Sequence, residues 1–144
     1  MITTDSLRVD VNRVVEVVCK FISEKVSVSK ADGVVLGLSG GMDSATLAFL
    51  CSKSLGGEKV LALILPSKVT SEEDVKDAVE VAEKAGVRHE VISIQEVIDC
   101  FSRVLRASES DVLPLGNLAV RVRMCTLYYY ACLLYTSPSP RDRG

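Results

Sequence analysis

The sequence predicts an α/β fold: a doubly wound parallel sheet with helices on both faces. Three short runs of apolar residues alternate with segments whose apolar residues recur at helical spacing. Strands that alternate with helices form a parallel sheet with right-handed crossovers. A glycine-rich turn, SGGMDS, stands between the first strand and the next helix. Because ligands bind beyond the carboxyl ends of such strands, this turn is expected at the ligand edge.

In the first half of the chain, the sequence pattern predicts four elements in order: a helix, a strand, a helix and a strand. Apolar residues at helical spacing predict an amphipathic helix over residues 5–29. Residues 34–38 are short and apolar, which is typical of a buried strand. Residues 43–55 have a helical pattern that a glycine pair ends. Residues 60–65 (VLALIL) predict a second buried strand, ended by a proline.

The segment after residues 60–65 predicts another helix that connects two parallel strands. This helix has two possible starts. Thr70 with Glu73, or Ser71 with Asp74, has the spacing of a capping box. Either start leads into an apolar face at helical spacing, which Gly86 ends.

The last third predicts a strand over residues 89–94 and a helix over residues 96–106. Residues 107–116 are expected to be a connector, after which Asn117 caps a final helix.

Composition bounds the class of protein. The 144 residues have the size of one domain, and 48% hydrophobic with 25% charged residues allows a packed core. A net charge of −2 provides no basic field, so neither nucleic acid nor a membrane is expected as a partner. No apolar run approaches the roughly 20 residues of a membrane span. The five cysteines are scattered without a CxxC pair, which favours buried free thiols in a reducing cytoplasm over zinc or disulfides.

The glycine turn has the composition of an anion site. Gly40 and Gly41 let the backbone approach a phosphate closely. The amides of the following helical turn lack internal partners and carry the positive end of the helix dipole. Ser39 and Ser44 add hydroxyl donors. The turn fits neither the Walker pattern, because no lysine follows the glycines, nor the dinucleotide pattern G-x-G-x-x-G.

The stretch SGGMDS resembles the pyrophosphate loop of the ATP pyrophosphatases, whose signature is SGGxDS. The resemblance implies the adenine nucleotide alpha hydrolase-like, Rossmann-like form of the fold. It also implies that the loop holds the pyrophosphate released from ATP, and that Asp43 helps bind magnesium. A carboxylate that shares a metal with a phosphate bridges to it instead of repelling it. The residues implied in ATP and pyrophosphate binding are Gly37, Leu38, Ser39, Gly40, Gly41, Met42, Asp43 and Ser44.

Two further stretches resemble the NAD synthetases within this group. LPSKVTSEEDVKDA is similar to their "PS…S.ED..DA", and GNLAVRVRMCTLYYYA is similar to their "GN..AR.RM..LY..A". Val120 stands where alanine is usual. The resemblance covers roughly residues 7–131 and rests on three motifs in the right order.

Arg121 and Arg123 cannot both point at one ligand, since positions i and i+2 of a helix do not share a face. The resemblance gives Arg121 the contact to the substrate deamido-NAD. Arg123 is then expected in a structural or subunit-interface ion pair.

The resemblance implies an ammonia-dependent NAD synthetase, a ligase that forms a C–N bond. The nicotinate carboxylate of deamido-NAD attacks the α-phosphorus of ATP, pyrophosphate leaves, and ammonia displaces AMP from the acyl-adenylate. The resemblance also implies Mg²⁺, with ATP as co-substrate, and a cytoplasmic homodimer. The reaction requires no side-chain nucleophile. Two alternatives stay open. One is another ATP pyrophosphatase, tRNA-modifying or GMP synthetase-like; the other is a non-catalytic nucleotide-binding module.

The end of the chain departs from this pattern. CLLYTSPSPRD can be encoded by the transposase-end adapter used to prepare sequencing libraries. We expect residues 132–144 to be a non-native, disordered tail and residues 1–131 to be the N-terminal part of a synthetase domain. The fold is then incomplete at its C-terminus, the family's "GT.NK.E" segment with its second magnesium acid is missing, and the chain alone is expected to be inactive and poorly stable.

Overall fold

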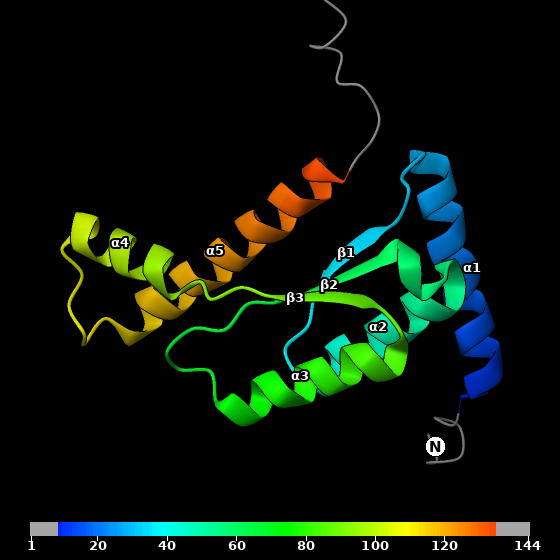
Figure 1. The fold of residues 1–144 in the computed structure, drawn as a ribbon, viewed down its shortest axis with the longest axis horizontal. Helices are drawn as coiled ribbons and strands as arrows, with labels where there is room; N and C mark the ends of the chain where they lie inside the picture. Colours follow the sequence, from blue (N-terminus) through cyan, green and yellow to red (C-terminus); the bar gives the residue numbers. More distant parts are fainter. Residues whose placement is uncertain (1–8, 135–144) are drawn as a thin grey trace, which may run out of the picture.

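A computed structural model describes residues 9–134. It has three strands, five α-helices and one short 3-10 helix within those residues (Figure 1). The elements are α1 (Val11–Ser29), β1 (Val34–Gly37), α2 (Met42–Leu55), η2 (Gly57–Lys59), β2 (Val60–Ile64), α3 (Glu72–Ala85), β3 (Arg88–Val91), α4 (Gln95–Leu105) and α5 (Val112–Leu133).

The three strands form one parallel sheet, as predicted. Their order in the sheet is β1-β2-β3. Leu36 of β1 is in register with Ala62 of β2, and Ala62 with His89 of β3. All five residues of β2 are buried, because this strand has a neighbour on each edge and helices on each face. A fully buried parallel strand is an uninterrupted apolar run, and this is why the VLALI segment was recognisable.

Helices cover both faces of the sheet, which confirms the doubly wound fold. One core lies between the sheet and helices α2 and α3, and it includes Leu36, Ala48 and Ala78. The other core lies between the opposite face and helices α4 and α5, and it includes Leu63, Ile98 and Val122. Figure 1 shows α2 and α3 on one side of the strands and α5 on the other.

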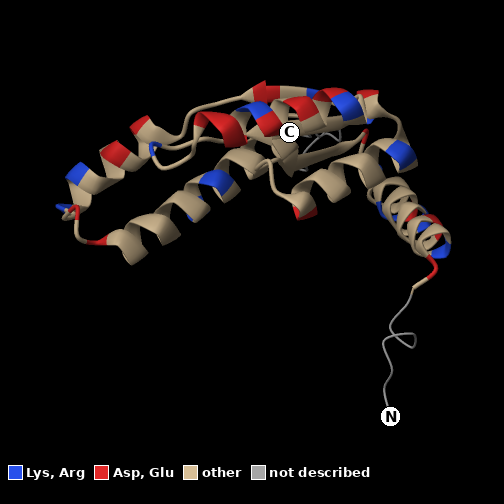
Figure 2. Cartoon of the chain, turned by 90° about the horizontal axis from the view of Figure 1, so that it is seen from below, with Lys and Arg blue, Asp and Glu red and all other residues tan. Residues whose placement is uncertain are grey.

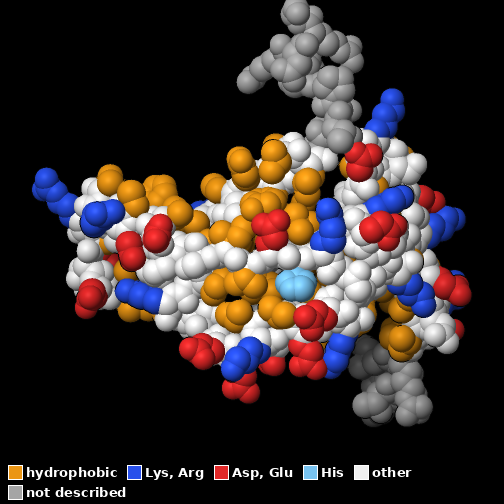
Figure 3. Space-filling view, in the orientation of Figure 1, with side chains coloured by type: hydrophobic (Ala, Val, Ile, Leu, Met, Phe, Trp, Pro, Cys, Tyr) orange, Lys and Arg blue, Asp and Glu red, His pale blue; other side chains and the backbone are white. Residues whose placement is uncertain are grey.

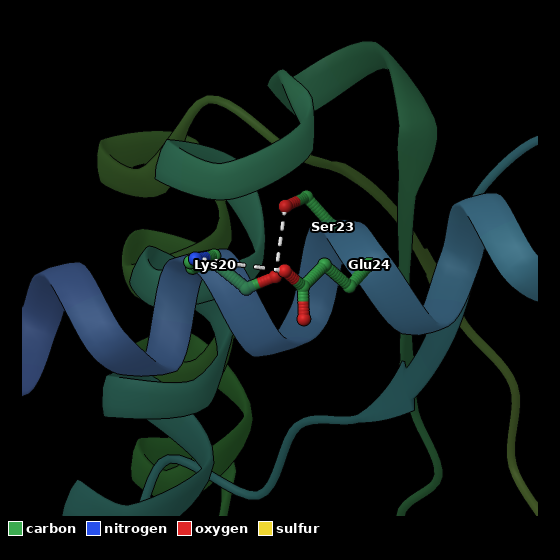
Figure 4. A network of polar contacts seen from close by, with 3 residues as sticks. All are labelled: Lys20, Ser23 and Glu24. Carbon is green, nitrogen blue, oxygen red and sulfur yellow. Dashed lines mark hydrogen bonds and ion pairs between the residues drawn. The ribbon is translucent and has the colours of Figure 1, made fainter.

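Helix α1 lies outside this sandwich and packs on α2 (Figure 1). The Ser54 hydroxyl of α2 donates to the Cys19 carbonyl of α1 over 2.6 Å. The outer face of α1 carries a small polar network, in which Lys20 lies 3.8 Å from Glu24 and the Ser23 hydroxyl donates to the Lys20 carbonyl (Figure 4). Such an exposed pair stabilises a helix by only about 0.3–0.5 kcal/mol.

The capping alternatives at α3 resolve in favour of Ser71 with Asp74. The Ser71 hydroxyl accepts from the Asp74 amide over 3.0 Å, and the Asp74 carboxylate accepts from the Ser71 amide over 3.4 Å. The Thr70 hydroxyl instead accepts from the amide of Ser67 over 3.0 Å, which closes the preceding turn.

Three boundaries differ from the sequence prediction by more than one residue. Helix α5 begins at Val112 instead of after Asn117, because Pro114 lies in the first turn, where its missing amide has no helical partner. Strand β3 ends at Val91 instead of residue 94, although the Ile92 amide still donates to the Ile64 carbonyl and the Ile94 amide to the Pro66 carbonyl. Helix α1 begins at Val11 with Asp10 as its cap, whereas residues 5–8 of the predicted 5–29 helix lie outside the described residues.

The end of α5 bears on the predicted tail. The helix continues through Cys132 and Leu133, two residues past the boundary expected at Ala131. Residues 135–144 lie outside the described residues, so the assignment of the tail stays a prediction.

The surface over α4 and α5 is rich in apolar side chains, as Figure 3 shows. Phe101 and Val104 of α4 and Leu113 and Tyr128 of α5 are exposed. Figure 2 shows the contrast with α3, which carries charged residues along its length, whereas α5 is almost uncharged. Within residues 9–134, no helix is both long and apolar enough to cross a membrane.

Candidate nucleotide site

The glycine loop lies at the carboxyl end of β1, as the topology predicts. The last bond of the β1–β2 ladder runs from the Leu38 amide to the Leu63 carbonyl over 2.9 Å. The chain then turns through Ser39–Gly41 and enters α2 at Met42. The loop therefore extends directly from strand β1, whose residues contribute to the cores on both faces of the sheet. Its position is thus determined by the core.

The serine hydroxyls of the loop bond to the loop itself. The Ser44 hydroxyl donates to the Gly41 carbonyl over 3.0 Å and lies 3.2 Å from the Ser39 hydroxyl. It also accepts from the Ser39 amide over 3.2 Å. With the Ser44 proton used, the Ser39 hydroxyl is the donor between the two. In this arrangement both hydroxyl protons are engaged within the loop, and the prediction that the two serines donate to a ligand stays a prediction.

The groups of the loop that can bind an anion are the backbone amides of α2. The first intrahelical bond runs from the Ala45 amide to the Gly41 carbonyl, so the amides of Met42, Asp43 and Ser44 have no helical partner. No side chain caps this helix. Uncapped amides at the positive end of a helix dipole are a binding site for phosphate.

The two loop glycines have different structural roles. Gly40 has a φ of +78°, a left-handed conformation that favours glycine. A β-carbon on Gly40 would lie 2.8 Å from the Asp74 carbonyl oxygen and 3.5 Å from the β-carbon of Asp77. Gly41 has a φ of −77°, and a β-carbon there would meet only the Ser39 hydroxyl, at 3.4 Å. Only Gly40 is therefore required for the turn and for its contact with α3.

A pocket of about 470 Å³ opens between the loop, the end of β2, the start of α3 and α5. Ser39 of the loop and Asp74 of α3 line it, together with Thr70 from the segment between β2 and α3. Arg123 and Leu127 of α5 form the facing wall. The pocket has the size and the mixed apolar and polar lining of a small-molecule site.

The structure brings part of the predicted set into this pocket. Gly37, Leu38 and Ser39 line it, whereas the remaining residues from Gly40 to Ser44 are not among its lining residues. Met42 is exposed, with a relative accessibility of 84% for the whole residue. The backbone of Met42, not its side chain, thus contributes to the loop.

The two arginines of α5 lie on different faces, as expected, and Arg123 makes a backbone contact instead of a structural ion pair; the subunit-interface ion pair stays a prediction. Its Nε donates to the Leu65 carbonyl over 3.1 Å, and its side chain lines the pocket. It forms no ion pair with the described residues. Arg121 is exposed, and its Nη1 lies 3.6 Å from the sulfur of Met124. The deamido-NAD contact predicted for Arg121 stays a prediction.

The acids near the loop fit a magnesium ion only in part. Asp43 is exposed in the first turn of α2, while the Asp74 carboxylate is held by the Ser71 hydroxyl at 2.7 Å. No cluster of three metal-ligating side chains occurs among residues 9–134. Mg²⁺ is commonly bound by one or two carboxylates with substrate phosphates and water, so Asp43 alone fits the ion only when a phosphate is bound beside it.

The comparisons with known proteins agree with this geometry. The model of the NAD synthase family matches residues 14–135. The chain belongs to the NAD synthase family. The NH(3)-dependent NAD(+) synthetase of Archaeoglobus fulgidus is 48% identical over 120 residues, which are 83% of this chain and 48% of that protein. The corresponding synthetase of Methanocaldococcus jannaschii is 45% identical over 120 residues, which are 82% of this chain and 46% of that protein.

Solved structures show the same fold. The NH3-dependent NAD synthetase of Campylobacter jejuni, in complex with the nitrate ion, matches with a TM-score of 0.82 and 38% identity over 89% of this chain and 55% of that one. The NMN synthetase of Francisella tularensis also matches with a TM-score of 0.82, at 33% identity, over 89% of this chain and 52% of that one. The chain spans about half the length of the curated relatives it matches.

Proposed function

We propose that this NAD synthase family chain provides the ATP- and pyrophosphate-binding part of an ammonia-dependent NAD synthetase. The enzyme would convert deamido-NAD, ATP and ammonia into NAD, AMP and pyrophosphate. The observation that carries the proposal is the SGGMDS loop at the carboxyl end of β1, whose α2 amides are uncapped beside a 470 Å³ pocket. Family membership supports the same reaction class.

The described residues have positioning and electrostatic roles in this proposal. The amides of Met42, Asp43 and Ser44 would hold the β- and γ-phosphates and then the leaving pyrophosphate. Gly40 keeps the backbone turn that presents these amides. The acyl-adenylate forms when the nicotinate carboxylate displaces pyrophosphate, so no nucleophilic side chain is needed.

Asp43 would hold Mg²⁺ jointly with the phosphates. When bound, this ion neutralises charge on the phosphates and polarises them for displacement. Asp43 lies in the first turn of α2, beside the amides assigned to those phosphates. Its carboxylate and the phosphate oxygens together provide the hard oxygen ligands that Mg²⁺ prefers.

The finer assignments belong to the same proposal. Arg121 would contact deamido-NAD, in line with its exposed position on α5 and with the match to the family motif. The enzyme would work as a cytoplasmic homodimer, which is consistent with the exposed apolar side chains of α4 and α5. Residues 132–144 would be a non-native tail.

A second acceptor is favoured by one comparison. The Francisella tularensis relative is an NMN synthetase, so nicotinate mononucleotide is a reasonable alternative to deamido-NAD. Both acceptors carry the same nicotinate carboxylate. The described residues that hold ATP would act identically on either of them.

A chimaera tests the proposal because this chain matches only half of its relatives. Residues 14–131 would replace the matching segment of the Archaeoglobus fulgidus synthetase, with which this chain is 48% identical. Purified chimaera would be supplied with ATP, Mg²⁺ and ammonia, and with either deamido-NAD or nicotinate mononucleotide. We expect NAD formation with equal release of pyrophosphate from deamido-NAD.

The outcomes separate the alternatives. Preference for nicotinate mononucleotide would move the function to the second acceptor. A folded chimaera that binds ATP without turnover of either acceptor would contradict the proposed reaction. The unmodified chain serves as control and is expected to bind ATP without forming NAD.

A further inference from the structure

We infer that Arg123 of α5 is a further phosphate-binding residue, which provides the positive charge that the glycine loop lacks. The inference rests on the proposed function and identifies how a loop without lysine holds a polyphosphate. It starts from the charges around the pocket. Within residues 9–134, Arg123 is the only basic residue that lines the pocket, and Asp74 is the only acidic one.

The loop itself carries no positive side chain. The segment from Gly37 to Leu50 contains no lysine or arginine, and its one charged residue is Asp43. A pyrophosphate with several negative charges would therefore meet a carboxylate together with helix-dipole amides. A helix N-terminus offers only about half a unit of positive charge. A cation from elsewhere in the fold would complete the site.

Arg123 is held in a position that suits this role. Its Nε donates to the Leu65 carbonyl, which uses one of the five N–H groups of the guanidinium. Its two Nη groups make no hydrogen bond to the described residues. The remaining donors form a fixed fork, which matches the spacing of two phosphate oxygens. The bond to Leu65 thus orients the guanidinium and leaves its binding edge free.

Arg123 and the start of the loop line one pocket. Ser39 lies at the start of the loop, and Arg123 lies on the facing wall of the same pocket. Asp74 and Arg123 form no ion pair, and the Asp74 carboxylate accepts from the hydroxyl and the amide of Ser71. A phosphate that extends from the α2 amides into this pocket would have Arg123 as its cationic neighbour.

The test is the binding of inorganic pyrophosphate to the full 144-residue chain, measured by calorimetry at low salt. We expect Arg123→Met to weaken binding about 10-fold to 100-fold, the range for a lost hydrogen bond to a charged group. Arg123→Lys keeps the positive charge but not the forked guanidinium. Its affinity for pyrophosphate should lie between that of Arg123→Met and that of the parent chain. Arg13→Met is the matched control, since Arg13 is exposed on α1, away from the pocket.

A purely structural arginine would give a different result. Loss of the Leu65 bond alone would lower the melting temperature of both Arg123 variants and leave the pyrophosphate affinity of the folded protein unchanged. That result would overturn the inference. Gly40→Ala distinguishes the role of the loop from the role of Arg123. If pyrophosphate binding were weaker in Gly40→Ala but normal in Arg123→Met, the loop would bind pyrophosphate and Arg123 would not. Absence of pyrophosphate binding by the parent chain would reject both.

Discussion

Gly40 of the loop packs against the backbone of Asp74 in α3, so closely that a β-carbon on Gly40 would lie 2.8 Å from the Asp74 carbonyl oxygen. This contact joins the loop after β1 to the first turn of the next crossover helix. Each therefore limits the movement of the other, and the amides of α2 are held ready for a ligand.

The two loop glycines provide a matched pair of variants. We expect Gly40→Ala to lower the free energy of unfolding by about 2 kcal/mol or more, because it combines a left-handed φ with a backbone clash. Gly41→Ala should change it by less than about 0.5 kcal/mol. Urea denaturation of both variants measures the difference. Equal losses at the two positions would contradict the role given to Gly40.

The capping box of α3 is the second test. Asp74→Ala removes the carboxylate that accepts from Ser71 and should cost about 1 kcal/mol of stability. Glu73→Ala is the control, since it removes an acid from the same helical turn without breaking the box. If the two variants had the same unfolding midpoint, the box would be energetically irrelevant.

Asp43 tests the magnesium assignment. Asp43→Ala should leave the fold intact and remove the enhancement of ATP binding by Mg²⁺, because it deletes the loop's carboxylate ligand. Calorimetric titration of ATP with and without Mg²⁺ would show this for parent and variant. An unchanged Mg²⁺ effect in the variant would place the ion elsewhere.

Tyr130 gives a pH-dependent prediction. Its hydroxyl donates to the Glu90 carboxylate over 2.9 Å, and this hydrogen bond, with some burial and the negative charge of Glu90, raises the pKa of the phenol above its usual value. The contribution to stability is full below the pKa of the unfolded phenol. It is lost as the pH rises through the higher pKa of the folded state.

Absorbance at 295 nm follows the ionisation of this phenol. In Glu90→Gln, one tyrosine should titrate at lower pH than in the parent chain. Tyr130→Phe identifies which transition is affected. A titration curve that Glu90→Gln leaves unchanged would rule out the α5–β3 hydrogen bond in solution.

The cysteines should react with alkylating reagents at different rates. Burial raises the pKa of Cys51, and the nearby Cys19 raises it further, so little reactive thiolate forms there. Cys100 is exposed. Iodoacetamide labelling followed by mass spectrometry should modify Cys100 well before Cys51. Fast labelling of Cys51 in the folded chain would show that the α1–α2 interface opens readily.

The sequence was sufficient for the fold where local signals agree. Strands β1 and β2 are apolar runs ended by glycine or proline, although only β2 is buried throughout, and Gly86 ends α3 in a left-handed conformation. The start of α5 was missed because Gly116 and Asn117 resemble helix-boundary residues, although here they lie within the helix. The prediction of buried cysteines holds for Cys51 but is wrong for three exposed ones, since burial depends on tertiary packing.

The site was predictable to the same extent. The SGGMDS pattern located the loop between β1 and α2, because a glycine pair between an apolar run and a helical pattern is a local signal; anion binding there stays a prediction. Arg123 could not be placed, since helical periodicity separates it from Arg121 but does not indicate which face meets the sheet. The bond from Arg123 to Leu65 spans 58 positions in the chain, and only the packing of α5 on the sheet creates it.

Strand β1 carries the loop, and within the described residues it is an edge strand, bonded only to β2. Edge strands are among the first parts of a sheet to exchange amide hydrogens, because each opens by breaking one ladder instead of two. The amide of Leu38, which makes the last bond of that ladder, should therefore exchange with deuterium sooner than the amides of β2. The rate at which β1 separates from β2 then sets how long the glycine loop stays in position.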